Sequence, residues 1–347
     1  MLNLSIHLNS TNSTNLTDYS TLGSCKWTGP PRQWFILNAI GLMPPLLTIL
    51  CNACNLVVFR AWHKKEPYVL FHVHLAFSSL MYGGVTVLAP LGRLIRPRLP
   101  IQWMQGVAMQ AGMVAHFLCF FSAAVISTDR WLSVEFPRFY QVQATKPKIL
   151  RVIACICGIT LVCTIPGVIV WNKCLVFFCF RAPAFLCEDR TIDLHVVLKG
   201  PFFIWALFLG QARIVMIAAQ IAIRVVRKRR TIVSLAIVDQ AGHPATPPPV
   251  TGLVWSTLLP GMAIVGASLM SNIPQFVTSA NKILRRMTFL EGDTSFMLVF
   301  VFFQHVASPF IYILFFRSYR NALKRMLRDL LKWSRTRFRR RILRFDY

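Results

Sequence analysis

Two neighbouring residues of opposite charge, Asp129 and Arg130, end a long uncharged stretch of this chain. Leu99 to Thr128 contains no Lys, Arg, Asp or Glu over 30 residues, and Trp131 follows the charged pair. A carboxylate beside a guanidinium forms a charge-assisted ion pair. The uncharged stretch is long enough for a helix that crosses a bilayer, which needs roughly 20 apolar residues. Taken alone, the pair is most simply interpreted as an interfacial ion pair where a helix leaves lipid.

The composition places the chain in the membrane class. Of the 347 residues, 55% are hydrophobic and only 14% are charged, which is more apolar surface than one soluble core of this size hides. The net charge of +26 does not indicate nucleic-acid binding, because the basic residues collect between apolar runs and in the final 31 residues, which hold 12 Lys or Arg. That distribution is typical of cytoplasmic loops and of a tail that faces anionic lipid.

Seven apolar stretches follow one another along the sequence. They cover about residues 34–59, 68–91, 99–128, 152–171, 195–223, 251–279 and 294–316. The predicted fold is therefore an all-α membrane protein, a seven-transmembrane helix bundle. After residue 316, apolar residues recur every three or four positions opposite Lys and Arg, which predicts an amphipathic eighth helix on the membrane surface.

The chain resembles the rhodopsin-like (class A) G-protein-coupled receptors over about residues 34–331. The resemblance rests on residues that occur in the family's order: Asn55, Asp129, Arg130, Pro137, Pro166, Pro274, Pro309 and Tyr312. An amide such as Asn55 within an apolar span needs hydrogen-bond partners on neighbouring helices. The start of the second span, Glu66-Pro67-Tyr68, resembles that of vertebrate odorant receptors. A narrower likeness to fish-type odorant receptors rests on Arg213-Ile214 with Ala218-Ala219, on the loop through Cys187-Glu188-Asp189-Arg190-Thr191 and on the end of the seventh span. The resemblance implies a receptor, with no enzymatic activity and no cofactor, that transmits an extracellular chemical signal to a heterotrimeric G protein, and an odorant is the candidate signal.

The resemblance also implies a switch at the cytoplasmic side. Its residues are Asp129, Arg130, Pro137, Pro309 and Tyr312. Asp129 would hold Arg130 at rest, and Arg130 would contact the G protein once the sixth span moves. Tyr312 would then help to hold the open state.

A ligand pocket is expected toward the other end of the bundle. The Asp that binds amines in related receptors lies eighteen residues before the Arg, and that position is Gly112 here, so a cationic amine has no counter-ion. The expected lining is Gly112, Met113, His116, Phe117, Asn272, Gln275 and Phe276. Two interpretations of His116 stay open, a ligand contact or a satisfied packing residue. The predicted ligand is small, largely apolar, and uncharged or anionic.

Topology follows from sequons and charge. Acceptor sequons begin at Asn3, Asn9, Asn12 and Asn15, which predicts a glycosylated extracellular tail over residues 1–33 without a cleavable signal peptide. The bundle then covers residues 34–316, and residues 317–347 form a cytoplasmic helix and basic tail. The expected location is the plasma membrane, with the C-terminus in the cytoplasm.

Four cysteines are expected on the oxidising side of the membrane: Cys25, Cys174, Cys179 and Cys187. Three pairings are possible. In related receptors the loop after the fourth span is tied to a Cys at the top of the third, but that position is Gln105 here. The resemblance therefore implies a rewired disulfide, either between Cys25 and the loop or within the loop. His72 and His74 lie on different helix faces, so no metal pair is expected.

The second span carries Ser79 where many related receptors carry the carboxylate of a sodium site, and the seventh carries Ser308 for the usual Asn. We therefore expect no sodium binding, because a buried cation needs an opposing charge. Other classes fit less well. A channel or transporter needs a polar pathway, which the spans lack apart from Arg213, and an intramembrane enzyme needs a nucleophile, metal or carboxylate cluster. Within the receptor class, an orphan peptide or lipid receptor is the alternative to an odorant receptor.

Overall fold

The computed structural model describes residues 31–62, 66–95, 102–171, 175–176, 184–185, 259–274 and 295–342, and scattered positions between 212 and 227. The helices are α1 (Pro31–Ala61), α2 (Val69–Thr86), α3 (Leu88–Ile95), α4 (Gln102–Glu135), α5 (Pro137–Gln143), α6 (Lys146–Trp171), α9 (Ser295–Phe315) and α10 (Arg317–Ile342). Residues 259–274 form a further helix. The prediction of an all-α chain holds for this part except at β1 (Leu175–Val176) and β2 (Ala184–Phe185), which pair antiparallel.

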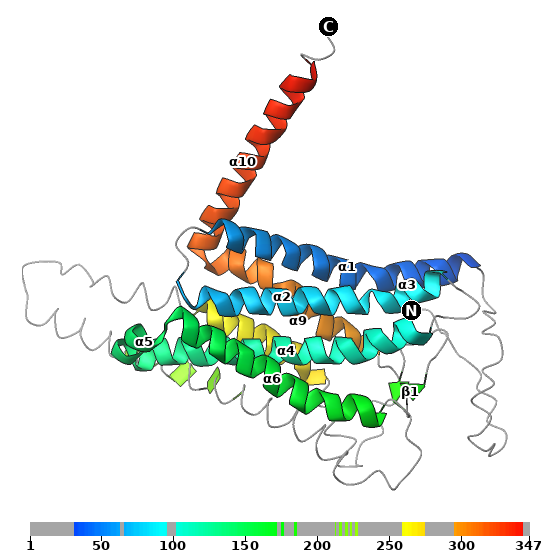
Figure 1. Ribbon diagram of the computed structural model, residues 1–347, viewed down its shortest axis with the longest axis horizontal. Helices are drawn as coiled ribbons and strands as arrows, with labels where there is room; N and C mark the ends of the chain where they lie inside the picture. Colours follow the sequence, from blue (N-terminus) through cyan, green and yellow to red (C-terminus); the bar gives the residue numbers. More distant parts are fainter. Residues whose placement is uncertain are drawn as a thin grey trace, which may run out of the picture.

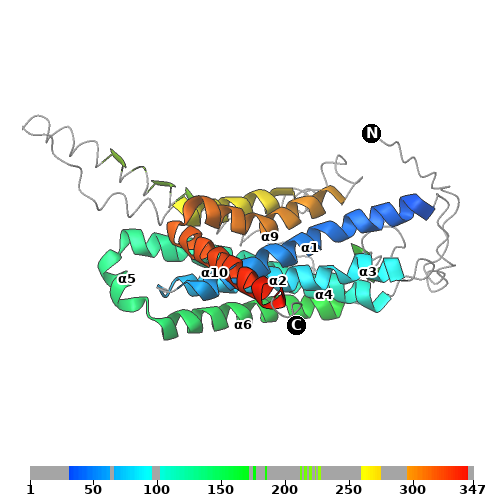
Figure 2. The same ribbon diagram turned by 90° about the horizontal axis from the view of Figure 1, so that it is seen from above.

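The long helices lie side by side in a bundle. Figure 1 shows α1, α2, α4 and α6 running in nearly the same direction, with α5 at one end of the bundle and α3 and β1 near the other. Figure 2 shows the same arrangement from above, with α9 beside α1. Helices satisfy their own backbone hydrogen bonds, which a lipid environment requires.

Among the described residues, three helical segments are long and apolar enough to cross a membrane: Asn38–Ala61, Val69–Ile95 and Trp103–Ser133. Phe300–Phe315 with Arg317–Asp329 is a fourth candidate if this bent pair is counted as one span. These findings support membrane insertion. The predicted fifth span lies almost entirely outside the described residues, and the sixth is described only over 259–274.

The third span differs from its predicted end. The uncharged run stops at Thr128, yet α4 continues through the charged pair to Glu135. The pair does not interrupt the helix because its two charges neutralise each other. The helix ends instead before Pro137, which stands at the first turn of α5, where a missing backbone N–H costs nothing.

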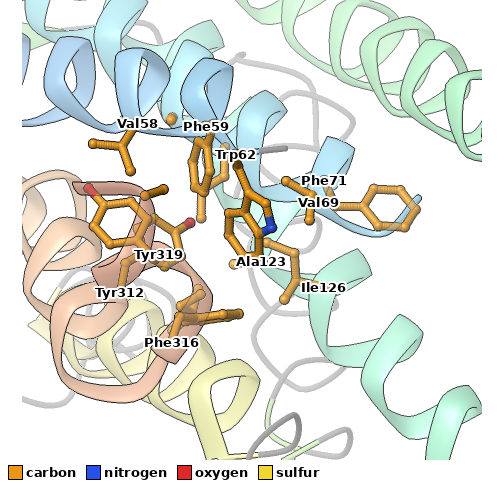
Figure 3. Packing of buried hydrophobic residues seen from close by; sticks show 14 of the residues in the cluster. Val58, Phe59, Trp62, Val69, Phe71, Ala123, Ile126, Tyr312, Phe316 and Tyr319 are labelled. Atoms are coloured by element: carbon orange, nitrogen blue, oxygen red, sulfur yellow. The ribbon is translucent and has the colours of Figure 1, made fainter. Parts of the chain in front are cut away.

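An aromatic core closes the bundle near the junction of α9 and α10. Phe59 of α1 meets the rings of Tyr312 and Tyr319 edge to face, with centroids 5.2 and 5.7 Å apart. Figure 3 shows these rings with Trp62 and Phe316 and the smaller residues around them. Edge-to-face packing of this kind adds about 0.5–1.5 kcal/mol per pair beyond area burial. The core thus holds Tyr312 in one place.

Asn55 links three helices, as the sequence predicted for a buried amide in an apolar span. Its Nδ2 donates to Ser308 Oγ of α9 at 3.2 Å, and its Oδ1 accepts the Tyr319 hydroxyl of α10 at 2.7 Å. Asn52, one turn earlier, donates to the His305 carbonyl at 2.8 Å. The prediction that Asn55 binds neighbouring helices is confirmed.

Helix α10 leaves the bundle sharply. It is bent by 96° from α9 at Phe316, and Figure 1 shows it leading away from the other helices. Arg320 donates to the carbonyls of Ile313 and Leu314 at 2.9 and 2.7 Å, which satisfies the C-terminal end of α9. Tyr319 and Ala322 are buried while Lys324 is exposed, so the predicted amphipathic pattern is present at the start of this helix.

Candidate functional site

Asp129 and Arg130 form a buried ion pair at the α5 end of the bundle, and we call this pair with its hydrogen-bonding partners the latch. Arg130 Nε donates to Asp129 Oδ2 at 3.0 Å, and Arg130 Nη2 contacts the same oxygen. The two side chains are only 7% and 8% exposed. A buried ion pair needs further hydrogen bonds to offset the desolvation of both charges. Those bonds come from outside α4.

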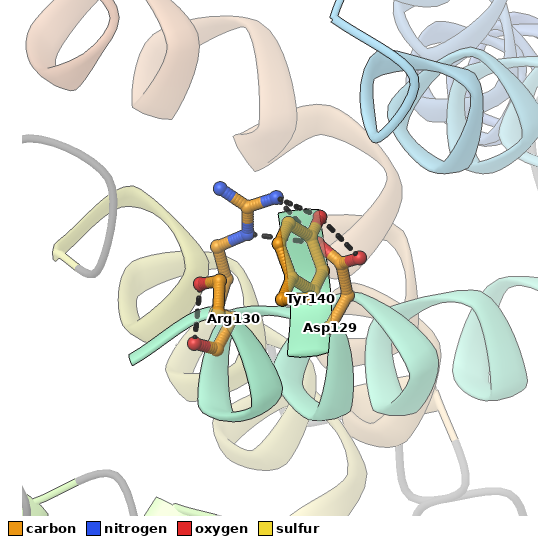
Figure 4. A network of polar contacts seen from close by, with 4 residues as sticks. Asp129, Arg130 and Tyr140 are labelled. Atoms are coloured by element: carbon orange, nitrogen blue, oxygen red, sulfur yellow. Dashed lines mark hydrogen bonds and ion pairs between the residues drawn. The ribbon is translucent and has the colours of Figure 1, made fainter. Parts of the chain in front are cut away.

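Two tyrosines complete the latch. The Tyr140 hydroxyl, from α5, donates to Asp129 Oδ1 at 2.8 Å (Figure 4). Burial and the neighbouring charge of Asp129 both raise the pKa of the Tyr140 phenol, so it remains a neutral donor. On the other side, the Arg130 guanidinium carbon lies 3.9 Å from the centre of the Tyr68 ring, a cation–π contact. Arg130 is therefore held by the three residues Asp129, Tyr140 and Tyr68.

Helix 259–274 covers this latch at Gly261. A Cβ atom at this position would lie 2.6 Å from Arg130 Cγ, closer than real Cβ atoms approach other atoms. Only glycine lets the helix backbone pass this close to the arginine. The helix of the predicted sixth span and the Arg130 side chain are thus packed directly against each other.

We expect Tyr140→Phe to loosen the latch without breaking it. The substitution removes the hydrogen bond to Asp129, and a hydrogen bond to a charged group contributes about 1.5–3 kcal/mol. Under the receptor function that the resemblance implies, basal nucleotide exchange by a G protein should rise by up to about 10–150-fold, the factor to which this free energy corresponds. The latch is weakened and not abolished, because Arg130 still binds Asp129. Tyr319→Phe, which removes a hydroxyl bound to Asn55 instead, is the control. A Tyr140→Phe protein with unchanged basal exchange would contradict this role.

Tyr312 is linked to the latch through two aromatic rings, that of His72 in α2 and that of Tyr68 just before α2. The Tyr312 hydroxyl lies 3.2 Å from His72 Nδ1, and the two rings meet edge to face. The His72 ring in turn contacts the Tyr68 ring, at 5.9 Å between centroids, and Tyr68 underlies Arg130. Pro309 is buried within α9, three residues before Tyr312. Of the five predicted switch residues, Asp129, Arg130 and Tyr312 thus belong to one connected region, and Pro309 lies on the same helix as Tyr312. The side chain of Pro137 lies outside the described residues.

A second polar network lies in the middle of the bundle. His116 Nε2 lies 3.1 Å from Asn272 Oδ1, and His116 Nδ1 lies 3.2 Å from His305 Nε2. His305 Nδ1 lies 3.2 Å from Ser79 Oγ, which contacts the Cys119 thiol at 3.4 Å. The network joins α2, α4, helix 259–274 and α9.

The hydrogen bonds of this network run in one direction. Asn272 Nδ2 donates to the Ser268 carbonyl at 2.7 Å, which fixes the amide orientation and leaves its Oδ1 as an acceptor. His116 therefore carries its proton on Nε2 and accepts at Nδ1 from His305 Nε2–H. His305 then accepts the Ser79 hydroxyl proton at Nδ1. With both imidazoles in the neutral form, each hydrogen bond of this network thus has one donor and one acceptor.

The predicted pocket residues are only partly placed. His116 and Asn272 come together, and both His116 nitrogens have protein partners, which favours its interpretation as a packing residue. Gly112 is buried, and a Cβ there would lie 3.2 Å from Thr86 Cγ2 of α2. Met113 and Phe117 are partly buried on α4. Gln275 and Phe276 lie outside the described residues.

A small cavity lies between α2, α4, helix 259–274 and α9. It has room for one water molecule, about 10 Å³, and its lining includes Ser268, Gln304 and Ser308. Gln304 Oε1 accepts a hydrogen bond from Asn272 Nδ2 at 2.9 Å. The other polar atom of the Gln304 amide, Nε2, is buried and has no hydrogen-bond partner. Ser268 Oγ has none either. A space of this size, whose lining residues include unpartnered polar groups, suits a single water molecule.

Several predictions fall outside the described residues. They concern the sequons at Asn3, Asn9, Asn12 and Asn15 and the disulfide candidates Cys25, Cys174, Cys179 and Cys187. Among the cysteines whose side chains the structure describes, five are free thiols within helices: Cys51, Cys54, Cys119, Cys155 and Cys157. The predicted divergence of His72 and His74 is confirmed, since His72 contacts Tyr312 while His74 contacts Ser122.

Sequence reasoning missed four functional residues: Tyr68, Tyr140, Gly261 and His305. A signal was present for His305, because it lies in an uncharged span one turn before Pro309, and a polar ring there needs a partner. Tyr140 and Gly261 had no such signal, since their importance comes only from their distance to Asp129 and Arg130.

Comparison with known proteins adds no relative from which a function could be transferred. No protein-family model matches the chain, and no curated protein is significantly similar to it. The fold and the site therefore define its class only as a helical protein with helices able to span a membrane. The function is argued from the residues themselves.

Proposed function

We propose that this chain is a seven-span receptor of the rhodopsin-like type, which transmits an extracellular chemical signal to a heterotrimeric G protein. The observation that carries the proposal is the latch: Arg130 is bound to Asp129 and lies directly under Gly261 of helix 259–274. A buried guanidinium that one helix movement would release is suited to binding a partner in only one of two states. The resemblance supplies the identity of that partner.

The proposed mechanism is a shift between two helix packings. In the packing described here, helix 259–274 covers Arg130, so the G-protein surface is incomplete. Movement of this helix away from α4 exposes Arg130, and the G protein binds that state. A ligand that favours the same packing is linked to the G protein by a coupling free energy of about 1–3 kcal/mol, or 5–150-fold in affinity. Tyr312, released from His72, helps to hold the open packing.

The class of ligand is inferred from the residue at position 112, where an amine receptor needs a carboxylate. Position 112 is a glycine packed against α2, so no carboxylate is present there to bind an amine. We propose a small, largely apolar ligand, uncharged or anionic, and an odorant is the first candidate. An orphan peptide or lipid receptor of the same fold is the alternative, and a channel or transporter is the less favoured class.

We place the receptor in the plasma membrane with a glycosylated, extracellular N-terminus and a cytoplasmic C-terminus. Helix α10 then lies at the cytoplasmic face, where its basic residues meet anionic lipid headgroups. Membrane lipid is thus a second partner, and nucleic acid is not one.

The test is reconstitution of the full-length protein in lipid vesicles with a panel of heterotrimeric G proteins. Apolar and anionic small molecules are screened, and guanine-nucleotide exchange is measured. We expect at least one compound to accelerate exchange by one G protein in an Arg130-dependent manner. Ion flux through the same vesicles without a G protein, together with no exchange activity, would replace the receptor proposal with a channel or transporter.

Sodium should not regulate this receptor. The imidazole of His305 contacts the Ser79 hydroxyl and stacks on the Tyr82 ring, with 3.9 Å between the ring centroids. An imidazole ring therefore lies next to Ser79, the position where a sodium site would need a carboxylate. No carboxylate is present among the described groups that contact Ser79. We expect basal exchange and agonist affinity to be unchanged when sodium is replaced by a bulky organic cation at constant ionic strength. A sodium-dependent loss of agonist affinity that persists in Ser79→Ala would show that another acid provides the site.

A further inference from the structure

A Cys–His–Ser cluster lies between α2, α4 and α6, apart from the latch and the mid-bundle network. His74 Nδ1 of α2 lies 2.7 Å from Ser122 Oγ of α4. His74 Nε2 lies 3.5 Å from the Cys157 sulfur of α6, within hydrogen-bond distance for a thiol. Three helices thus bring together a base, a thiol and a hydroxyl that are far apart in the sequence.

The hydrogen bonds determine which nitrogen of His74 acts as the base. The Ser122 hydroxyl donates to the Leu118 carbonyl at 2.6 Å, so its oxygen is left to accept from His74 Nδ1–H. His74 Nε2 therefore has a free lone pair directed at the Cys157 thiol. A thiol, a base and a third group that orients the base form the arrangement that activates a cysteine nucleophile.

The neighbouring cysteine of the same helix supplies a natural comparison. Cys155 is exposed, whereas Cys157 is partly buried. Exposure alone would make Cys155 the faster thiol, but the described contacts place the histidine at Cys157. The surface near Cys157 is apolar, since Leu161, one turn later, is 46% exposed. A reagent that reaches Cys157 in a membrane must therefore dissolve in lipid.

We propose that Cys157 is a covalent modification site for membrane-dissolved α,β-unsaturated carbonyl compounds. The sulfur forms a bond to the β-carbon while the thiol proton passes to His74 Nε2, and the electron pair of the C=C bond moves onto the carbonyl as an enolate. The imidazolium then returns the proton to the α-carbon. The net reaction adds S–H across the C=C bond, and it needs no oxidant, reductant or second reactant.

The placement of the site between helices gives the modification a structural consequence. The added chain must lie where α6 meets α2 and α4, so it separates helices that are packed in the unmodified protein. This inference uses only contacts among these three helices. It does not depend on the proposed receptor function.

The experiment uses the full-length protein in phospholipid vesicles and an apolar long-chain enone with an alkyne tag. Modification of each cysteine is followed over time by peptide mass spectrometry. We expect Cys157 to react faster than Cys155 by roughly a hundredfold, the low end of the 10²–10⁴-fold that a positioned general base contributes, because Cys155 is the more exposed thiol. A charged, membrane-impermeant maleimide should not show this preference, because it does not enter lipid.

Two variants separate base catalysis from simple access. His74→Gln retains a hydrogen-bonding side chain but cannot take the thiol proton, so the Cys157 rate should fall to that of Cys155 or below. Ser122→Ala leaves the base in place but unoriented, so an intermediate rate is expected. Equal or faster modification of Cys155 in the unaltered protein would overturn the proposal, and that comparison needs no variant to fold. A His74→Gln protein with an unchanged Cys157 rate would overturn it as well.

Discussion

Arg130→Ala should reach the cell surface and fail to catalyse nucleotide exchange by any G protein, with or without ligand. Arg130 is buried in this packing, and its guanidinium is held by Asp129, Tyr140 and Tyr68, so its exposure requires movement of helix 259–274. Without it, the open packing lacks the group proposed to bind the G protein. Surface expression is measured by antibody labelling and exchange by nucleotide uptake in membranes.

The controls address folding and the opposite half of the latch. Arg138→Ala removes an exposed arginine of α5 near the same end of the bundle and should leave exchange intact. Asp129→Asn removes the charge that holds Arg130, so basal exchange should rise, by up to about 5–150-fold if the pair provides the coupling of about 1–3 kcal/mol. Normal coupling by Arg130→Ala at normal surface density would refute the switch.

Gly261→Ala should make the proposed receptor active without ligand. The added Cβ would lie 2.6 Å from Arg130 Cγ, so either the arginine or helix 259–274 must move. The arginine is restrained at its far end by Asp129 and Tyr68, so we expect the helix to be displaced outward. Displacement of this helix is the proposed activating movement. Basal nucleotide exchange is therefore expected to exceed that of the unaltered protein at equal surface density.

Gly266→Ala is a matched control on the same helix. A Cβ at Gly266 meets no atom within 4 Å, so it changes helix propensity without altering packing. Both substitutions should stabilise the helix by about 1 kcal/mol through propensity, which isolates the steric effect at Gly261. Equal basal exchange in the two variants would show that contact between helix 259–274 and Arg130 does not hold the receptor closed.

The elements of the bundle follow from the sequence because they depend on local properties. Lack of charge over more than 20 residues determines which stretches can enter lipid, and this placed α1, α2, α4 and α9 close to their observed bounds. The role of Asn55 also followed, since a buried amide in an apolar helix must find partners. The continuation of α4 past Asp129 was missed because the end of the span was taken from the first charged residue, although the ion pair of Asp129 and Arg130 does not oppose burial.

Only the tertiary structure decided which side chains meet. Asn55 and Ser308 are 253 positions apart, and His116 and His305 are 189 apart, so no local pattern relates them. His305 beside Ser79, Tyr140 on Asp129 and Gly261 on Arg130 depend on how the helices are rotated and how closely they approach. These quantities arise from the packing of all the helices together. The sequence by itself thus determined which segments are apolar helices and which residues carry charge, while the packing determined which polar groups satisfy one another and so which helix movement would release Arg130.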